Sequence, residues 1–353
     1  MHAEEMIDTA LDRSVVLGYA NIGLEVRKRL PGWPAGPSRM DGKVVLVTGA
    51  GSGIGLAAAA GFAALGASVR ALGRDESRAA QAAALTRQRA GNQDADVRPV
   101  ACDVSSRAAI RAFTEQFSAQ EQRLDVLVNN AGVMPDERTR TADGIEAMFA
   151  THVLAPWMLT DGLLPLLKAA APSRVINVTS GGQYDQKVPA GDLESEHTRY
   201  GPKKVYARTK REQVVLTREW ARRLLPEGIF VHAMHPGWAD TKGVREWMPV
   251  FRAVTRPFIR TPEQGADTIV WLGSAPEAIQ STGWLWQDRR PRPFTYRIGA
   301  GPDDNATAGR LWDYVADLAA SQAALPRAEP GREAGDSGLQ AHPAVHQGPP
   351  RGA

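Results

Sequence analysis

The feature that most constrains this chain is a glycine-rich stretch at residues 48–55, which reads Thr-Gly-Ala-Gly-Ser-Gly-Ile-Gly. It directly follows the strand-like run 43–47, which is Lys43 and four apolar residues, and precedes an alanine-rich segment of high helix propensity. This order predicts a strand, a tight turn and a helix. Glycines let the backbone bend sharply and let a diphosphate approach the amide groups. Free N–H groups and the positive end of the helix dipole then hold the negative charge, so the stretch predicts a dinucleotide-binding site.

Strand-like and helix-like segments alternate along the rest of the chain. Repeated β-α-β units predict an α/β fold with one doubly wound parallel sheet and helices on both faces. Such a sheet binds its ligand at the carboxyl ends of the strands. Residues 306–320 predict a terminal helix. The expected strands are 43–48, 67–72, 97–101, 124–129, 174–179, 229–234 and 282–287.

Composition shifts suggest three regions: a helical extension with a linker at 1–40, a catalytic domain at 41–325 and a disordered tail at 326–353. The net charge is +3, and the basic residues are not interleaved with aromatics, so we expect no nucleic-acid partner. Cys102 is the only cysteine, which excludes an intrachain disulfide and favours a cytoplasmic protein. We find no signal peptide, no transmembrane run and no metal-ligand spacing.

Residues 8–30 carry apolar side chains at steps of three or four, which predicts one helix with one apolar stripe. Basic residues lie near the stripe. One interpretation is a helix docked on the body of the protein, which we favour; the other is a helix lying on a membrane surface. The stripe consists of Leu11, Val15, Tyr19, Ile22, Val26 and Leu30, and the basic residues are Arg13, Arg27, Lys28 and Arg29.

The second chemical pattern is Tyr206-Ala-Arg-Thr-Lys210. On a helix, residues four apart share a face, so Tyr206 and Lys210 lie together. An ammonium beside a phenol lowers the pKa of the phenol, which prepares it for proton exchange near neutral pH. The strand 174–179 ends at Ser180, which places this hydroxyl at the carboxyl edge of the sheet.

Together these motifs resemble those of the short-chain dehydrogenases/reductases, and more narrowly the retinol-dehydrogenase-like branch. The resemblance covers residues 41–320. The ordered motifs are Thr48–Gly55, Asn129-Asn130-Ala131-Gly132, Ser180, Tyr206-x-x-x-Lys210 and Pro236-Gly237, and the branch likeness is carried by 13–16, 179–182, 205–217, 234–241 and 287–291. It implies a single Rossmann-type domain and an oxidoreductase that passes a hydride to or from a nicotinamide coenzyme.

The resemblance also implies residue roles. Tyr206 exchanges a proton with the substrate oxygen, Ser180 hydrogen-bonds that oxygen, and Lys210 holds the nicotinamide ribose. Homo-oligomers built from helix faces near 150–170 and 206–224 are implied as well. The implied cofactor-binding residues are Gly49, Ser52, Gly53, Ile54, Gly55, Arg74, Asp103, Asn129, Ala131, Tyr206, Lys210, Pro236, Gly237 and Thr241. For Asn129 a role in tying strands together is equally compatible, and for Asp103 a role as a turn residue.

His152 departs from the family pattern, because many members carry an asparagine there that supports a water bridged to the lysine. Histidine also donates and accepts hydrogen bonds, so a relay is one interpretation. A packed core histidine without a catalytic part is the other.

The end of the second strand indicates the choice of cofactor. NAD sites place a carboxylate there for the ribose 2′-hydroxyl. Here Gly73 takes that place and Arg74 follows, while Asp75 is one position further. A guanidinium binds a 2′-phosphate with paired hydrogen bonds, so we expect NADP(H) rather than NAD(H).

Segment 242–262 mixes apolar and basic residues at helix-like spacing. Core packing is one interpretation; a lid over a bulky apolar substrate is the other, and we favour it. We therefore expect an NADP(H)-dependent oxidoreductase acting on a lipophilic alcohol or its aldehyde or ketone. The alternative is a nucleotide-binding sensor or partner-binding protein with little catalysis. The apolar residues of the segment are Val244, Trp247, Met248, Phe251, Val254 and Phe258, and the basic ones are Arg245, Arg252, Arg256 and Arg260.

Overall fold

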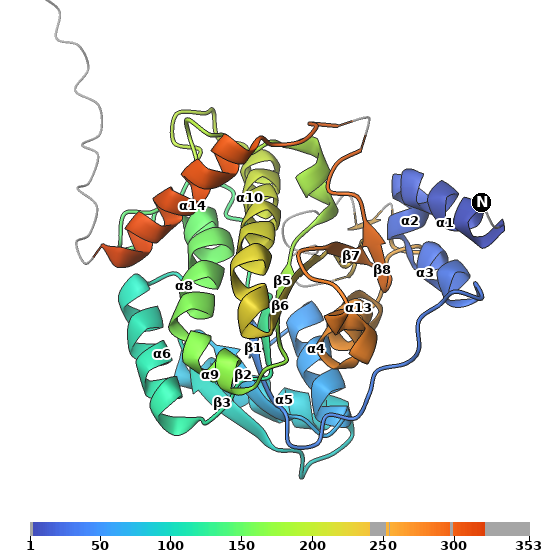
Figure 1. Ribbon diagram of the computed structural model, residues 1–353, viewed down its shortest axis with the longest axis horizontal. Coiled ribbons are helices and arrows are strands. Elements are labelled where there is room, and N and C mark those ends of the chain that lie inside the picture. Colours follow the sequence, from blue (N-terminus) through green and yellow to red (C-terminus); the bar gives the residue numbers. More distant parts are fainter. Residues whose placement is uncertain (1–2, 241–251, 254, 297–298, 322–353) are drawn as a thin grey trace, which may run out of the picture.

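The computed structural model describes residues 3–240, 252–253, 255–296 and 299–321. Its centre is one eight-stranded sheet with the strand order β3-β2-β1-β4-β5-β6-β7-β8 (Figure 1). All neighbouring strands are parallel except the last pair, β7 and β8. The strands are β1 (Val44–Thr48), β2 (Ser68–Gly73), β3 (Val97–Ala101), β4 (Val126–Asn129), β5 (Ser173–Val178), β6 (Ile229–Met234), β7 (Leu285–Gln287) and β8 (Arg290–Arg292).

The predicted parallel sheet is confirmed, and each of the seven expected strands is present. β8 was not expected. It follows β7 after only two residues, Asp288 and Arg289, which both have φ +53°. Two successive residues of positive φ form the tight turn that reverses a strand, so β8 runs antiparallel at the edge.

Helices cover both faces of the sheet. Alternate residues of β1 show this: Val44 and Leu46 belong to one apolar core, whereas Val45 and Val47 belong to the other. The first core is closed by α6 (Arg107–Gln120), α8 (Ala155–Gly162), α9 (Leu164–Ala169), α10 (Pro202–Leu224) and α14 (Asn305–Ala320). The second is closed by α4 (Gly53–Ala64), α5 (Glu76–Ala90) and α13 (Pro262–Ser274).

One helix of the first layer has an irregular start. α7 (Ala147–Phe149) passes into a π-helical turn, η1 (Ala150–Leu154), which continues as α8. His152 lies in this turn, and its side chain is completely buried. The short 3₁₀ helix η2 (Gly181–Asp185) follows Ser180 and leads away from the end of β5.

The N-terminal segment is not the single helix that the apolar spacing predicts. It forms α1 (Ala3–Arg13), α2 (Val15–Tyr19) and α3 (Asn21–Lys28), which we call the N-terminal arm. Ser14 caps α2 with its side chain, and the extended Ala20 separates α2 from α3. Because of these two breaks the stripe does not share one face: Tyr19 is buried, whereas Ile22 is 42% exposed.

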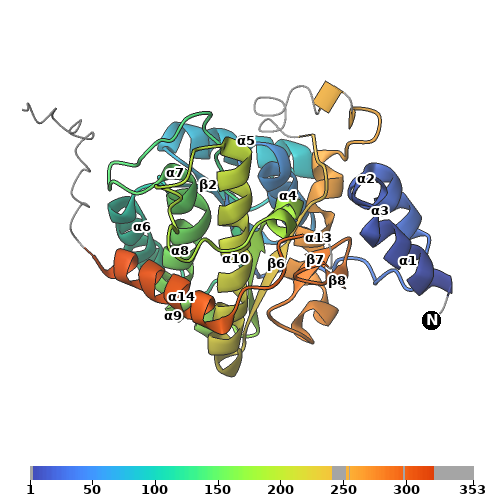
Figure 2. The ribbon, with the colours of Figure 1, turned by 90° about the horizontal axis from the view of Figure 1, so that it is seen from above.

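The arm is docked beside β7 and β8, where both views place it (Figures 1 and 2). Buried ion pairs join the two parts, including Asp8 with Arg292 and Arg27 with Asp288. Docking, the interpretation favoured from the sequence, is therefore confirmed. Arg27, counted there among the basic residues near the stripe, is fully buried.

Several sequence-based predictions concern residues outside the described part. These are Thr241, most of the lid segment 242–262, and the tail 326–353. Within the described residues, no helix combines the length and the apolar character that spanning a bilayer requires.

Candidate active site

The glycine-rich turn between β1 and α4 is shaped by close backbone contacts. Gly49 and Gly53 have φ values of +68° and +54°. A β-carbon at Gly55 would lie 2.3 Å from the carbonyl oxygen of Gly49 and 2.4 Å from the Asn130 amide nitrogen, so glycine is required. Ser52, the N-cap of α4, makes no side-chain hydrogen bond to the first turn. The first N–H groups of α4 thus lack the usual side-chain acceptor, which fits a diphosphate bound at this helix end.

The end of β4 holds this turn in place, a role that sequence reasoning did not assign. The Thr48 hydroxyl accepts hydrogen bonds from the backbone N–H groups of Asn130 (2.9 Å) and Ala131 (3.0 Å). The Asn130 side chain donates to the Thr48 carbonyl oxygen at 2.9 Å. The motif Asn129-Asn130-Ala131-Gly132 was the available signal for this role.

Asn129 ties two strands together. Its amide nitrogen donates to Asn177 on β5 at 2.9 Å, and the Asn177 amide donates in turn to the Thr217 hydroxyl of α10 at 2.9 Å. The Asn129 side chain is only 2% exposed. This arrangement matches the strand-tying role considered for Asn129. The sequence did not identify Asn177 or Thr217.

The end of β2 has no room for a carboxylate. A β-carbon at Gly73 would lie 2.4 Å from the backbone nitrogen of Ala79 on α5, so no side chain fits there. Asp75 caps α5 by accepting the Arg78 N–H at 2.9 Å. Arg74, between them, is exposed. Asp103 accepts hydrogen bonds from both the N–H and the hydroxyl of Ser105, as a turn residue does.

Ser180 and Tyr206 lie together at the carboxyl end of β5. The turn after Ser180 packs on α10, because a β-carbon at Gly182 would lie 3.5 Å from the Ala207 β-carbon and 3.8 Å from the Ser180 hydroxyl. Lys210 follows one helical turn later, with its amine 5.7 Å from the centre of the Tyr206 ring. The amine donates to the Val178 carbonyl oxygen at 2.9 Å.

The electrostatics of this group differ from the sequence-based expectation. Burial raises the pKa of Tyr206 to about 12, and a hydrogen bond with Ser180 opposes the increase. Burial also lowers the pKa of Lys210 to about 7. The expectation that Lys210 lowers the pKa of Tyr206 is therefore wrong for this arrangement. The reason is that desolvation of the phenolate dominates, while burial also lowers the pKa of the Lys210 amine that was expected to stabilise it.

His152 has no free ring nitrogen. Its Nε2 accepts the Val133 N–H at 3.0 Å, and its Nδ1 lies 2.8 Å from the Thr209 hydroxyl. The Thr209 hydroxyl donates to the Tyr206 carbonyl oxygen at 2.9 Å, so Nδ1 carries the proton and donates to Thr209. Burial and the nearby Lys210 hold the pKa of His152 well below its usual value. The geometry favours the packed histidine over the relay.

Pro236 and Gly237 follow β6 and lie against the N-terminal arm. Gly237 has φ +70°, and a β-carbon there would lie 2.7 Å from both the Arg260 guanidinium and the Tyr19 carbonyl oxygen. Arg260 donates to the Pro236 carbonyl oxygen at 3.2 Å and is 1% exposed. It is therefore a buried anchor and not part of an exposed lid. Ile54 packs against Gly265 of α13 on the other side of the glycine-rich turn.

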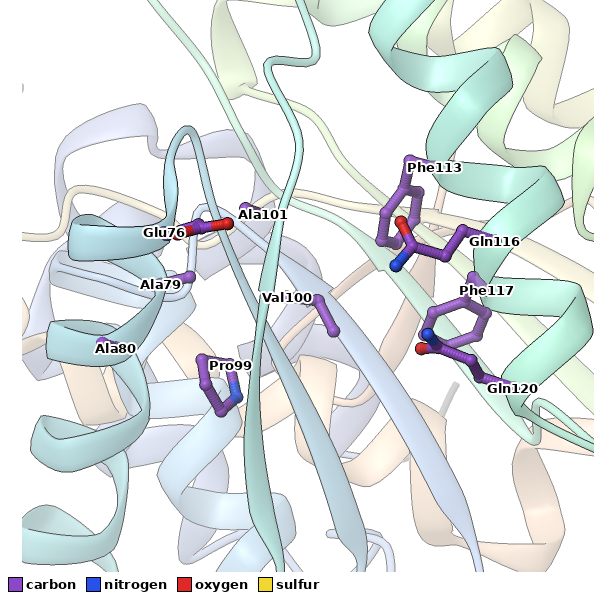
Figure 3. A pocket seen from close by; sticks show the side chains of 10 residues that line it. All are labelled: Glu76, Ala79, Ala80, Pro99, Val100, Ala101, Phe113, Gln116, Phe117 and Gln120. Carbon is purple, nitrogen blue, oxygen red and sulfur yellow. The ribbon is translucent and has the colours of Figure 1, made fainter.

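A groove on the outer edge of the sheet is separate from this group. Figure 3 shows it above β3, between α5 and α6. Its lining includes Glu76, Pro99, Phe113 and Phe117, and none of the predicted site residues. Most of the described residues that sequence analysis singled out follow the carboxyl ends of β1, β4, β5 and β6, while Arg74 follows β2 and Asp103 follows β3.

Comparison with known proteins agrees with this arrangement. A family model described as "short chain dehydrogenase" matches residues 43–249. Dehydrogenase/reductase SDR family member 12 of Homo sapiens is 44% identical over 282 residues, which cover 80% of this chain and 87% of that protein. Retinol dehydrogenase 14 of Mus musculus is 36% identical over 291 residues, covering 78% of this chain and 86% of that protein. The predicted family and branch are confirmed.

Solved structures share the fold. L-Sorbose reductase from Gluconobacter frateurii, complexed with NADPH and L-sorbose, has a TM-score of 0.57 and 25% identity, covering 71% of this chain and 96% of that one. 3-Ketoacyl-(acyl-carrier-protein) reductase from Brucella melitensis, complexed with NADH, has a TM-score of 0.54 and 27% identity, covering 69% and 96%. The chain therefore belongs to the short-chain dehydrogenase/reductase family, and it is an oxidoreductase that acts on CH–OH and C=O groups.

Proposed function

We propose that this chain is an NADP(H)-dependent oxidoreductase that interconverts a lipophilic alcohol and its aldehyde or ketone. The carrying observation is the placement of Ser180 beside Tyr206 at the end of β5, with Lys210 one helical turn beyond. This pair lies at the same edge of the sheet as the glycine-rich turn, where a doubly wound sheet binds its ligand.

The residues divide the chemistry as follows. A bound nicotinamide coenzyme supplies or accepts the hydride. In the direction of reduction, Tyr206 gives its hydroxyl proton to the carbonyl oxygen of the substrate, while the Ser180 hydroxyl hydrogen-bonds that oxygen. In the direction of oxidation, Tyr206 takes the proton back. Lys210, whose amine donates to the Val178 carbonyl oxygen, would hold the ribose of the coenzyme.

The preference for NADP(H) rests on the end of β2. A carboxylate cannot be placed at position 73, because α5 fills that space, and Asp75 is already engaged as a helix cap. The exposed guanidinium of Arg74 is free to pair with a 2′-phosphate. Gly49, Ser52, Gly53, Ile54, Gly55, Asn129, Ala131, Pro236 and Gly237 complete the proposed coenzyme contacts, with Asp103 beside the adenine.

The substrate class follows from the relatives and from the apolar segment after β6. Retinol dehydrogenase 14 is named for a bulky apolar alcohol. Phe258, at the described end of the lid segment, is 46% exposed. We expect long-chain and polycyclic carbonyl compounds to be reduced faster than small aliphatic ketones.

Tyr206→Phe tests the function directly. The change keeps the ring and removes the proton, so turnover of apolar aldehydes, followed by NADPH absorbance, should collapse. NADPH binding, followed by fluorescence, should remain. Equal turnover of both proteins would remove Tyr206 from the mechanism. If the unchanged protein binds NADPH but turns over none of the apolar aldehydes, the result favours the alternative, a nucleotide-binding sensor.

Contact with a membrane surface is a second proposal, and one observation favours it. Five of the eight large apolar side chains that are exposed in the described residues belong to the N-terminal arm: Met6, Ile7, Val16, Leu17 and Ile22. Exposed apolar side chains that gather on one element are typical of a protein surface that contacts a membrane. Flotation with anionic vesicles should be lost in a variant with Val16 and Leu17 changed to serine. Unchanged flotation would exclude this surface.

Homo-oligomers remain a prediction, and α14 limits which surfaces they can use. Trp312 of α14 packs against both Trp157 and Trp220, with ring centres 5.7 and 4.7 Å away. These two residues belong to the helix faces from which the family resemblance implies assembly. An oligomer must therefore use other surfaces or displace α14, and sedimentation of the protein with Trp312→Ala compared with the unchanged chain separates these cases.

A further inference from the structure

The N-terminal arm reaches the turn that carries the catalytic serine. A β-carbon placed on Gly181 would lie 2.3 Å from Cε2 of Tyr19 and 2.9 Å from its hydroxyl oxygen. The Tyr19 ring therefore rests directly on the backbone of the residue after Ser180. On the next residue, Gly182, the β-carbon of Ala207 takes the corresponding place at 3.5 Å. The turn after Ser180 is thus clamped between Tyr19 of the arm and the helix that carries Tyr206.

The Tyr19 ring also packs against the ring of His235. His235, at the end of β6, lies with its ring centre 4.8 Å from that of Tyr19 and is 1% exposed. Neither nitrogen of His235 has a hydrogen-bond partner among the described residues. Burial lowers the pKa of His235 to about 3, so the imidazole is neutral and packs as an aromatic surface. Tyr19, which is 6% exposed, has little freedom to rotate away.

The backbone on either side of Tyr19 is fixed by polar contacts. The Tyr19 carbonyl oxygen accepts the Trp238 N–H at 2.9 Å. The Gly18 carbonyl oxygen accepts three hydrogen bonds, from Arg27 (2.9 Å), Arg260 (2.9 Å) and Gln287 (2.8 Å). A carbonyl with three buried donors cannot leave without stranding them.

A buried chain of charges completes the attachment. Asp288 lies between Arg27 of the arm, at 2.5 Å, and Arg260 of the body, at 2.6 Å. All three side chains are at most 2% exposed. Removing the arm would leave Asp288 and Arg260 without part of their pairing in a buried place, which is unfavourable. The arm is therefore a permanent part of the fold and not a detachable extension.

We propose that Tyr19 is a positioning residue of the active site, which fixes the Gly181–Gly182 turn and so aims the Ser180 hydroxyl at Tyr206 and the substrate oxygen. This inference rests on the proposed function and assigns the arm a part in it. Tyr19 acts through Ser180 and is not itself required to touch the substrate. Its ring matters for this role, and its hydroxyl, which makes no hydrogen bond in the described part of the chain, does not.

The test compares three variants of the full chain. Tyr19→Ala removes the ring, Tyr19→Phe keeps it, and Leu24→Ala makes a cavity elsewhere in the arm, at a residue that is fully buried in α3. Two measurements are made on each: kcat with NADPH and an apolar aldehyde, and hydrogen–deuterium exchange of the amides of residues 180–186. The dissociation constant of NADPH and the melting temperature report on the rest of the molecule.

For Tyr19→Ala we expect kcat to fall by about 10- to 100-fold, since small misplacements of a reacting group have effects of this size. Hydrogen–deuterium exchange of the amides of residues 180–186 should be faster, and NADPH affinity should be unchanged. Tyr19→Phe should match the unchanged protein. Leu24→Ala should lower the melting temperature and leave kcat and the exchange of residues 180–186 unaffected.

The proposal fails if Tyr19→Ala retains both the kcat and the exchange of the unchanged protein. It also fails if Leu24→Ala reduces kcat as much as Tyr19→Ala does, because a general loss of stability would then account for both. If the unchanged protein reduces no carbonyl compound, the proposed function fails instead. The exchange of residues 180–186 still decides whether Tyr19 holds the serine turn.

Discussion

The Nδ1 atom of His152 and the hydroxyl of Thr209 lie 2.8 Å apart and join the π-helical turn before α8 to the helix that carries Tyr206. The His152 ring also meets the Tyr206 ring edge-on, with centres 5.3 Å apart. A histidine thus stands where many family members have an asparagine, and it makes direct contacts on both sides. The contacts assign it to the architecture around Tyr206, and they predict how variants behave.

Thr209→Val should destabilise the protein without changing its pH dependence. The change leaves the Nδ1–H of His152 buried without an acceptor, which costs about 1–3 kcal/mol. Urea unfolding measures the loss. Thr209→Ser keeps the hydroxyl and should restore most of the stability. A change in the pH dependence of kcat between pH 5 and 7 would contradict this assignment and point to a relay through His152.

Arg74→Ala should weaken binding of NADPH and leave binding of NADH almost unchanged. A hydrogen bond to a charged group contributes about 1.5–3 kcal/mol, so we expect a loss of roughly 10- to 100-fold in NADPH affinity. Fluorescence titration with each coenzyme measures the difference. Arg98→Ala, at an exposed arginine on β3, serves as the control. A chain that binds NADH ten times more tightly than NADPH would overturn the assignment.

The two directions of the reaction should respond differently to pH. Burial raises the pKa of Tyr206 to about 12, so the phenol is protonated throughout the neutral range. Reduction requires the protonated form, so the titration of Tyr206 should not change the reduction rate between pH 6 and 9. Oxidation requires the phenolate, so its kcat/KM should rise about tenfold per pH unit over that range. Initial rates in both directions test this. An oxidation rate that levels off below pH 8 would show a much lower pKa for Tyr206 in the working enzyme.

Glu212→Gln should stabilise the protein above neutral pH. Glu212 of α10 is fully buried, and neither carboxylate oxygen has a hydrogen-bond partner among the described residues. Burial and the nearby Glu146 raise the pKa of Glu212 well above its usual 4.5, and burial raises the pKa of Glu146 to about 7. Above pH 4.5 the folded chain therefore binds more protons than the unfolded chain. Its free energy of unfolding consequently falls as pH rises, by up to about 1.4 kcal/mol per pH unit for each group.

Urea unfolding at pH 5 and pH 8 measures this effect. The glutamine side chain of the Glu212→Gln variant is neutral at both pH values. Its free energy of unfolding should therefore fall less between pH 5 and pH 8 than that of the unchanged chain. Glu115→Gln, which changes an exposed residue of α6, is the control. Its free energy of unfolding should fall between pH 5 and pH 8 by as much as that of the unchanged chain. If Glu212→Gln has no effect on the decrease, Glu212 is ionised in the folded protein.

Much of the fold could be predicted because its signals are local. The run Val44–Val47 is apolar at every position, as a strand buried on both faces must be, and the glycines that follow Thr48 specify the turn by themselves. The positions of Ser180, Tyr206 and Lys210 follow from one strand end and one helical repeat. These parts of the site need no knowledge of distant contacts.

The remaining features depend on partners far away in sequence. Nothing near Arg27 or Arg260 shows that Asp288 will neutralise both, so each looks like a surface charge until the fold is known. The break at Ala20 is equally hidden, because the apolar spacing continues through it. The raised pKa of Tyr206 arises from burial by other elements, which a Tyr-x-x-x-Lys pattern cannot reveal.

The attachment of the arm also has a consequence for the order in which the chain folds. The helices of the arm find their partners near residues 258–292, which lie far later in the sequence. Contacts of such long sequence separation form slowly, and until they form the arm presents apolar side chains to its surroundings. We therefore expect the arm to dock late in folding, after β7 and β8 have joined the sheet, and Tyr19 to reach the turn after Ser180 only then.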